Sequence, residues 1–177
     1  DKLHGTSYTI IPDRIVAGTY MAAAAITAGD VTLTNIVPAH INAVSAKLRQ
    51  MGCQVDFGPG TVRVRAPRRL RHIDQVATNP YPAFPTDLQA QIVAVATVAE
   101  GTSVVVENVF ESRYKHVAEL IRMGAHITVN DRTAIIRGVE KLQGAVVTAK
   151  DLRGGAALVL AGLAAHGPTV VQHSDYI

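Results

Sequence analysis

An aspartate, Asp87, lies where a stiff loop runs into an apolar helix, and its carboxylate could accept a proton or bind a hydroxyl group. Prolines and aromatic residues make up most of residues 81–85, which therefore cannot form a helix interior or a paired strand. An apolar run begins at Leu88, so Thr86 or Asp87 is expected to supply the oxygen that caps the helix. Two interpretations stay open: Asp87 is only a helix cap, or it is a functional carboxylate at a positive helix end.

A second candidate group follows the next predicted strand, in the segment V-F-E-S-R-Y-K-H. Phe110 and Arg113 stand at its junction with another helix. They could simply begin that helix with a solvated charge. Alternatively, Arg113 could hold an anion or the carboxylate of Asp87, because a guanidinium group binds carboxylates with two parallel hydrogen bonds. Phe110 could then form a wall against a sugar.

Motifs of nucleotide-binding folds and zinc proteases are absent from the sequence. It contains no G-x-G-x-x-G, no G-x-x-x-x-G-K-[ST] and no H-E-x-x-H, and its seven histidines lack the spacing of metal ligands. His116 and His126 are therefore expected at the surface or only partly packed. Cys53 has no neighbouring base and is expected to be a small core residue. We expect neither a metal ion nor a cofactor.

The composition is that of a globular protein from a reducing compartment. The 177 residues are 48% hydrophobic and 18% charged, enough for a large core in one or two domains. A single cysteine excludes a disulfide framework and fits the cytoplasm. No apolar run is long enough to cross a bilayer.

The net charge is only +3, but one stretch is strongly basic. Six basic residues fall within ten positions: Arg63, Arg65, Arg68, Arg69, Arg71 and His72. Such a cluster is either a solvated strand end and loop or a surface that follows the phosphates of a nucleic acid. Aromatic residues between the arginines would favour the second interpretation, and the cluster has none.

The elements that must position these residues recur along the chain. Leu48–Val55 matches Leu120–Ile127 at an offset of 72, and each match places a glycine where a helix ends and a hairpin begins. The repeating unit is strand, helix, strand, helix, strand, strand, about 70 residues long. Two complete units, roughly 6–74 and 75–143, and the start of a third, 144–177, predict one partial domain over residues 1–177.

The first helix of each unit begins at an aspartate and is nearly all apolar, over residues 13–28, 87–100 and 151–166. A helix that is apolar on all sides is buried on all sides. The second helices, about 39–51 and 113–123, are amphipathic. We therefore expect an α/β (α+β) fold in which apolar helices pack at the centre and the sheets lie outside, an inside-out barrel or prism.

Four long, collinear motifs resemble those of one enzyme family. They are I-P-D-R-I-V-A-G-T-Y, P-A-F-P-T-D-L-Q-A-Q, V-F-E-S-R-Y-K-H-V-A-E-L-I-R-M-G-A and G-V-E-K-L-Q-G-A-V-V-T-A-K-D-L-R. The family is that of the UDP-N-acetylglucosamine enolpyruvyl transferases (1-carboxyvinyltransferases) within the EPSP synthase family, and the resemblance covers essentially all 177 residues. It implies two domains of three such units that close on a cleft. There the sugar 3′-hydroxyl attacks phosphoenolpyruvate and phosphate leaves, in the first committed step of peptidoglycan synthesis.

The resemblance also implies roles for particular residues. Asp87 matches the aspartate that binds the sugar and takes up the 3′-hydroxyl proton, and Val109 matches a position whose backbone touches the nucleotide sugar. Phe110 and Arg113 line that side of the cleft, and the D-L-R of Asp151 and Arg153 faces the other domain on closure. The predicted catalytic residues are thus Asp87, Arg113, Asp151 and Arg153, and the predicted UDP-N-acetylglucosamine contacts are Thr86, Asp87, Val109 and Phe110.

Several parts of the family's active site have no counterpart in this sequence: the mobile loop with its cysteine or aspartate, the N-terminal Lys-Asn pair and the phosphate-binding arginines. The chain therefore resembles the C-terminal domain alone and is expected to be inactive by itself. Its expected partners are UDP-N-acetylglucosamine, phosphoenolpyruvate and the other domain of the same bacterial cytoplasmic enzyme, with no nucleic acid and no membrane. Two alternatives remain, a shikimate 3-phosphate type of enolpyruvyl transferase and a module resembling RNA terminal-phosphate cyclases or RNA-binding domains.

Overall fold

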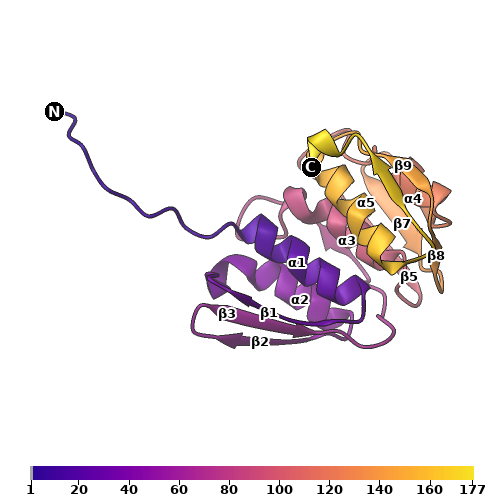
Figure 1. The fold of residues 1–177 in the computed structure, drawn as a ribbon, viewed down its shortest axis with the longest axis horizontal. Coiled ribbons are helices and arrows are strands. Elements are labelled where there is room, and N and C mark those ends of the chain that lie inside the picture. The colour runs from indigo at the N-terminus through magenta and orange to yellow at the C-terminus, as the bar shows by residue number, and fades with distance from the viewer. Residues whose placement is uncertain (1) are drawn as a thin grey trace.

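Three helices lie side by side at the centre of the computed structural model, which describes residues 2–177 (Figure 1). They are α1 (Arg14–Ile26), α3 (Gln89–Ala96) and α5 (Leu152–Ala164). Every residue of α3 is buried, because α1, α5 and a sheet surround it. α1 and α5 each keep an open side, where Tyr20 is 58% and Leu163 61% exposed. The prediction of complete burial is therefore right for α3 and wrong for the two helices beside it.

Acidic residues begin two of these helices, as predicted. Asp13 caps α1 by accepting a hydrogen bond from the N–H of Ile15 at 2.6 Å. Asp151 caps α5 through the N–H of Gly154 at 2.7 Å. At its other end α1 stops at Ile26, before the predicted end at residue 28, because Ala28 adopts the left-handed conformation (φ 53°) and turns the chain.

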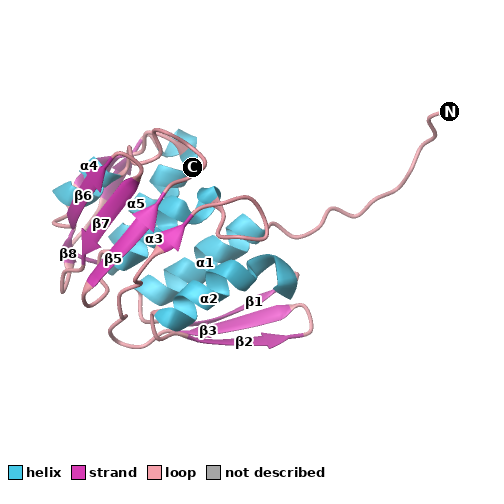
Figure 2. Cartoon of the chain, turned by 180° about the vertical axis from the view of Figure 1, so that it is seen from behind, coloured by secondary structure: helices cyan, strands magenta, loops and turns pink. Residues whose placement is uncertain are grey.

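Sheets and short ladders cover the central helices (Figure 2). The strands in chain order are β1 (Asp30–Thr34), β2 (Gln54–Gly58), β3 (Thr61–Arg65), β4 (Val76–Ala77), β5 (Thr102–Val106), β6 (His126–Asn130), β7 (Thr133–Arg137), β8 (Leu142–Gln143), β9 (Val146–Thr148), β10 (Ala165–His166) and β11 (Val170–Gln172). One sheet has the antiparallel order β1-β3-β2, and a second has the order β4-β5-β7-β6 with β4 parallel to β5. β8 pairs with β10 and β9 with β11, both in parallel.

The strands of the first sheet alternate between core and solvent, as the period of a strand requires. Val62 and Val64 are buried, whereas the arginine beside each is exposed. Arg63 pairs with Asp30 at 2.6 Å and Arg65 with Asp56 at 2.7 Å. Two members of the basic cluster are thus neutralised on their own sheet, which favours the solvated-strand interpretation of that cluster.

Two further helices, α2 (Asn42–Gln50) and α4 (Val117–Arg122), are the second helices of the predicted units. Each is followed by the predicted left-handed glycine, Gly52 (φ 97°) and Gly124 (φ 90°). α4 begins four residues later than predicted, because the segment before it is fastened to the second sheet. The Tyr114 hydroxyl lies 2.8 Å from the carbonyl oxygen of Val105, so this segment forms turns in place of helix.

Residues 2–12 run away from the helices as an extended segment (Figure 2), although the repeat predicts a strand before α1. β4 and β9 each pair with the strand that follows their helix, and residues 2–12 have no such partner within the described chain. An unpaired segment leaves its backbone hydrogen bonds to water and is no strand. The inside-out arrangement of helices and sheets is confirmed, whereas closure into a barrel or prism and the division into one partial domain stay predictions.

Two buried residues test the predictions about isolated polar side chains. Cys53 is buried as predicted, and its burial raises the pKa of the thiol to about 11. His116 is wrongly predicted near the surface, because it packs beneath the first turn of α5 at Gly154. Burial lowers the pKa of His116 to about 4, so the ring is neutral at pH 7. His126 is exposed.

In residues 2–177 no helix is both long and apolar enough to cross a membrane.

Candidate active site

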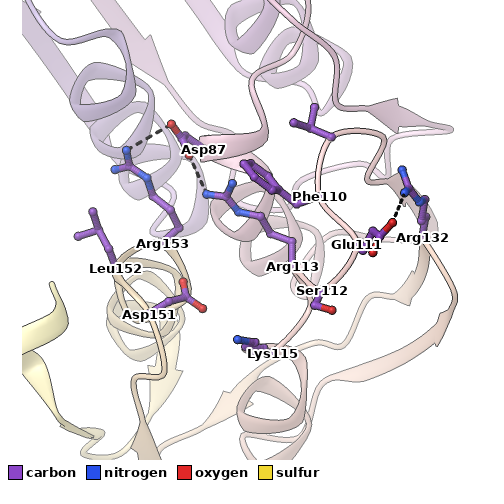
Figure 3. A pocket seen from close by; sticks show the side chains of 11 residues that line it. Asp87, Phe110, Glu111, Ser112, Arg113, Lys115, Arg132, Asp151, Leu152 and Arg153 are labelled. Carbon is purple, nitrogen blue, oxygen red and sulfur yellow. Dashed lines mark hydrogen bonds and ion pairs between the residues drawn. The ribbon is translucent and has the colours of Figure 1, made fainter.

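A pocket of about 820 Å³ opens where the segments before α3, α4 and α5 meet (Figure 3). Six of the seven predicted site residues line it: Asp87, Val109, Phe110, Arg113, Asp151 and Arg153. The seventh, Thr86, is the neighbour of Asp87 and bonds to Arg113. The sequence did not single out four other polar residues of the lining: Glu111, Ser112, Lys115 and Arg132.

The carboxylate of Asp87 lies between two guanidinium groups (Figure 3). Nη2 of Arg113 is 2.7 Å from Oδ1, and Nη2 of Arg153 is 3.4 Å from Oδ2. The arginine side chains are 18% and 27% exposed and the Asp87 side chain 40%. Of the two interpretations of Arg113, the structure shows the one in which it holds the Asp87 carboxylate.

The predicted helix cap is wrong for both candidates. Residues Thr86–Leu88 form a 3-10 turn, η2, before α3, and no side chain caps either element. The Asp87 carboxylate is drawn to the two arginines, and the Thr86 hydroxyl donates to Glu107. A guanidinium group offers the carboxylate a full positive charge, whereas a backbone N–H offers only a partial one, which explains the preference of Asp87 for the arginines.

The charge of Asp87 is set by opposing effects. Partial burial alone would raise the pKa of this carboxyl group, because it disfavours the ionised form. The hydrogen bond from Arg113 and the positive charge of Arg153 together outweigh burial and hold the pKa of Asp87 below its ordinary value. Without a ligand, Asp87 is therefore an ionised hydrogen-bond acceptor at neutral pH.

Phe110 and Val109 form an apolar edge of the pocket beside this carboxylate. Their side chains are exposed, and the Arg113 guanidinium lies 4.7 Å from the centre of the Phe110 ring. This cation–π contact is a second interaction that holds Arg113 in place, in addition to its ion pair with Asp87. The N–H of Val109 donates to Glu107 at 2.9 Å, which leaves the carbonyl as the backbone group of Val109 that can contact a ligand.

Asp151 and Lys115 lie further along the pocket from Asp87 (Figure 3). One oxygen of Asp151 caps α5, so its carboxylate is held in place by the helix that also carries Arg153. No cluster of three or more potential metal ligands occurs within residues 2–177.

Glu107 is a buried carboxylate next to the pocket that sequence reasoning missed. It follows β5 and is fully buried. Its Oε1 lies within hydrogen-bonding distance of the hydroxyls of Thr78 (2.8 Å) and Thr86 (2.9 Å). The same oxygen accepts the N–H groups of Val109 at 2.9 Å and Phe110 at 3.1 Å. One buried carboxylate thus ties together the two segments that carry the pocket's aromatic edge and its acidic group.

The family profile described as EPSP synthase (3-phosphoshikimate 1-carboxyvinyltransferase) matches residues 1–177, the whole chain. The chain belongs to the EPSP synthase family. UDP-N-acetylglucosamine 1-carboxyvinyltransferase 2 of Caldanaerobacter subterraneus is 52% identical over 176 residues, which are 99% of this chain and 42% of that protein. UDP-N-acetylglucosamine 1-carboxyvinyltransferase of Desulfofundulus thermocisternus is 54% identical over 178 residues, 100% of this chain and 73% of that protein.

Solved structures of other proteins share this fold. The enolpyruvyl transferase NikO from Streptomyces tendae superimposes with a TM-score of 0.81 at 27% identity, over 96% of this chain and 40% of that one. EPSP synthase from Acinetobacter baumannii gives a TM-score of 0.71 at 19% identity, over 94% of this chain and 40% of that one, and supports the fold alone. The chain therefore spans about 40% of the length of most of these relatives.

Proposed function

We propose that this chain forms one side of the active site of a UDP-N-acetylglucosamine 1-carboxyvinyltransferase. The enzyme would transfer the enolpyruvyl group of phosphoenolpyruvate to the sugar 3′-hydroxyl and release phosphate. The observation that carries the proposal is the Asp87 carboxylate, held between two guanidinium groups on the wall of an 820 Å³ pocket. Relatives with this activity in their names are 52% and 54% identical to the chain, which favours this acceptor over shikimate 3-phosphate.

In this proposal Asp87 accepts the proton of the 3′-hydroxyl group. A general base works best when its pKa is near the operating pH, whereas the two arginines lower the pKa of Asp87. The longer contact, 3.4 Å to Arg153, is the weaker of the two ion pairs. We infer that Arg153 turns to the anionic groups of phosphoenolpyruvate when both substrates bind. Loss of that positive charge raises the pKa of Asp87 and makes it a better base.

The other lining residues place the sugar against this base. Phe110 offers an exposed aromatic face next to Asp87, and aromatic faces suit the apolar side of a sugar ring. The Val109 carbonyl and the Thr86 segment supply polar contacts to the nucleotide sugar. Arg113 keeps the Asp87 carboxylate in position throughout. Asp151, fixed at the start of α5, faces the part of the enzyme that closes over the pocket.

The rest of the proposed enzyme supplies what these residues lack. A general base contributes roughly 10²–10⁴-fold to a rate, and enolpyruvyl transfer also needs cations around the departing phosphate and exclusion of water. We therefore propose that a second domain completes the cleft and that the chain by itself does not turn over. The setting would be the cytoplasm of a bacterium, in the first committed step of peptidoglycan synthesis and hence of cell-wall growth and division.

Phosphate release from phosphoenolpyruvate tests this proposal in a full-length protein that contains the chain. UDP-N-acetylglucosamine should support release, shikimate 3-phosphate should not, and the 177-residue chain should be inactive until the separately expressed remainder is added. Release with shikimate 3-phosphate alone would show an acceptor of the other type. Turnover by the chain without the remainder would refute the assignment of the phosphate-side groups to a second domain.

A further inference from the structure

A continuous series of hydrogen bonds leads from the core to the proposed base. Glu107, fully buried after β5, accepts the hydroxyl hydrogen of Thr86 at 2.9 Å to Oε1 and 3.0 Å to Oε2. The oxygen of the same hydroxyl group lies 3.3 Å from Nη1 of Arg113. The other terminal nitrogen of Arg113, Nη2, holds Oδ1 of Asp87 at 2.7 Å. Each member therefore touches the next one in the series.

We propose that Glu107 is a positioning residue for the transferase reaction: it orients the Thr86 hydroxyl, which orients Arg113, which holds the carboxylate of Asp87. This role rests on the proposed function of Asp87 as proton acceptor. Glu107 itself lies behind the pocket wall and does not line the pocket. It acts on the reaction only through its neighbours.

The chemistry of a hydroxyl group gives this series its direction. A threonine hydroxyl has one hydrogen to donate and two lone pairs to accept. Because a carboxylate can only accept, Glu107 takes the hydrogen of Thr86, and the lone pairs of Thr86 are left to face the N–H donor of Arg113. A neutral amide at position 107 could donate to Thr86 and so reverse this hydroxyl group.

A second threonine, Thr78, bonds to the same carboxylate and serves as a control that distinguishes positioning from stability. The Thr78 hydroxyl donates to Oε1 of Glu107 at 2.8 Å and accepts the N–H of Asn108 at 3.0 Å. Thr78 is fully buried, and its hydrogen bonds lead away from Arg113. Removal of either hydroxyl takes one donor from Glu107, but only removal of the Thr86 hydroxyl breaks the series that ends at Asp87.

The first experiment compares Thr86→Val with Thr78→Val in the full-length protein, with phosphate release and melting temperature measured for both. Both variants should melt lower, but Thr86→Val should lower kcat by about 10-fold or more and Thr78→Val by less than about 3-fold. Thr86→Ser keeps the hydroxyl and should recover most of the lost kcat. Glu107→Gln should lower kcat as Thr86→Val does, and the two substitutions together should cost little more than either alone. Equal losses for the two valine variants would overturn the proposal.

A double-mutant comparison asks whether the effect passes through Asp87. If Thr86 acts by holding Arg113 and Asp87, Thr86→Val should lower kcat much less in an Asp87→Asn background than in the wild type. If Thr86 contacts substrate independently, the two losses should multiply. That outcome would overturn the proposal.

A third readout does not depend on turnover. The pKa of Asp87 can be followed by ¹³C NMR of its carboxyl carbon in the same full-length protein, with the signal identified by its loss in Asp87→Asn. Thr86→Val and Glu107→Gln should both raise the pKa of Asp87, because Arg113 is freed, and Thr78→Val should leave it unchanged. An unchanged pKa in the first two variants would refute positioning by Glu107. A wild-type protein without phosphate release would refute the proposed function but would leave this measurement valid.

Discussion

Asp87→Asn in the full-length protein separates catalysis from stability more clearly than any other single change at the site. Asparagine keeps an oxygen that can accept from Arg113 but carries no charge and cannot take up the hydroxyl proton. The ion pairs lost are 18–40% exposed, and partly exposed pairs contribute only about 1 kcal/mol or less to folding after screening by solvent. We therefore expect a fall of a few degrees at most in melting temperature.

The expected effect of Asp87→Asn on the reaction is much larger. Loss of a general base lowers kcat by roughly 10²-fold or more, which corresponds to about 2.7 kcal/mol in the activation barrier. Phosphate release under saturating substrates gives kcat, and calorimetric titration gives the affinity for UDP-N-acetylglucosamine. A folded Asp87→Asn protein that binds the sugar nucleotide and keeps kcat within a few-fold of wild type would refute the role of Asp87 as base.

Asp13→Asn is the matched control for this substitution. Asp13 is a real helix cap, it is not part of the pocket lining, and asparagine caps a helix about as well as aspartate. The control should change the free energy of unfolding by less than about 0.5 kcal/mol and leave kcat at the wild-type value. A comparable loss of kcat in Asp13→Asn would show that a change at helix α1 lowers kcat as well, so the loss in Asp87→Asn could not be attributed to the pocket.

Three further predictions concern charge and packing. Arg153→Gln should raise the pKa of Asp87 in a ¹³C NMR titration, because it removes a positive charge next to the carboxylate; a pKa that stays put or falls would contradict the ion pair. The neutral, buried His116 should make the free energy of unfolding depend on pH, because its folded pKa of about 4 lies below the unfolded value of about 6.5. The contribution of His116 to that free energy is therefore fully present above pH 6.5 and is lost, on the order of 3 kcal/mol, as the pH falls toward 4. In denaturant unfolding at several pH values, His116→Leu should lack this part of the pH dependence of the free energy of unfolding. The same pH dependence in both proteins would refute the prediction. Gly138→Ala should lower the melting temperature far more than Gly124→Ala, because a Cβ at 138 would lie 1.5 Å from the carbonyl oxygen of Ala99. A Cβ at 124 meets nothing within 4 Å and costs only about 1–2 kcal/mol for the positive φ of that residue. Similar melting temperatures for the two variants would contradict this packing.

Much of the fold was predictable because periodicity reports which faces are buried. The apolar helices lie inside the sheets as predicted, and Gly52 and Gly124 end their helices as predicted. The error at Tyr20 has a simple cause: an apolar pattern shows that a face avoids water but does not show whether a neighbour is there to cover it.

The site was predictable in its members and less so in their contacts. Local pattern placed Asp87 at a helix start, but its partners lie 26 and 66 residues further along the chain, beyond the reach of any capping rule. Glu107 could have been noticed, because it directly follows β5 and continues the alternation that buries Ser103 and Val105, and a buried carboxylate needs donors. Its actual donors depend on the tertiary fold and could not be read from the sequence.

The distance along the sequence between Asp87 and its two arginines has a consequence for folding during synthesis. During synthesis Asp87 leaves the ribosome well before Arg113, and Arg153 follows only when α5 begins. Contacts between distant residues form late, because the loop between them must close first. A nascent chain that ends before residue 153 can therefore bury α3 only partly, and Arg113 is the one of the two arginines that it can offer to Asp87. The arrival of α5 buries α3 and brings the second guanidinium group, that of Arg153, to Asp87 in one event, so completion of the core and of the pocket wall coincide.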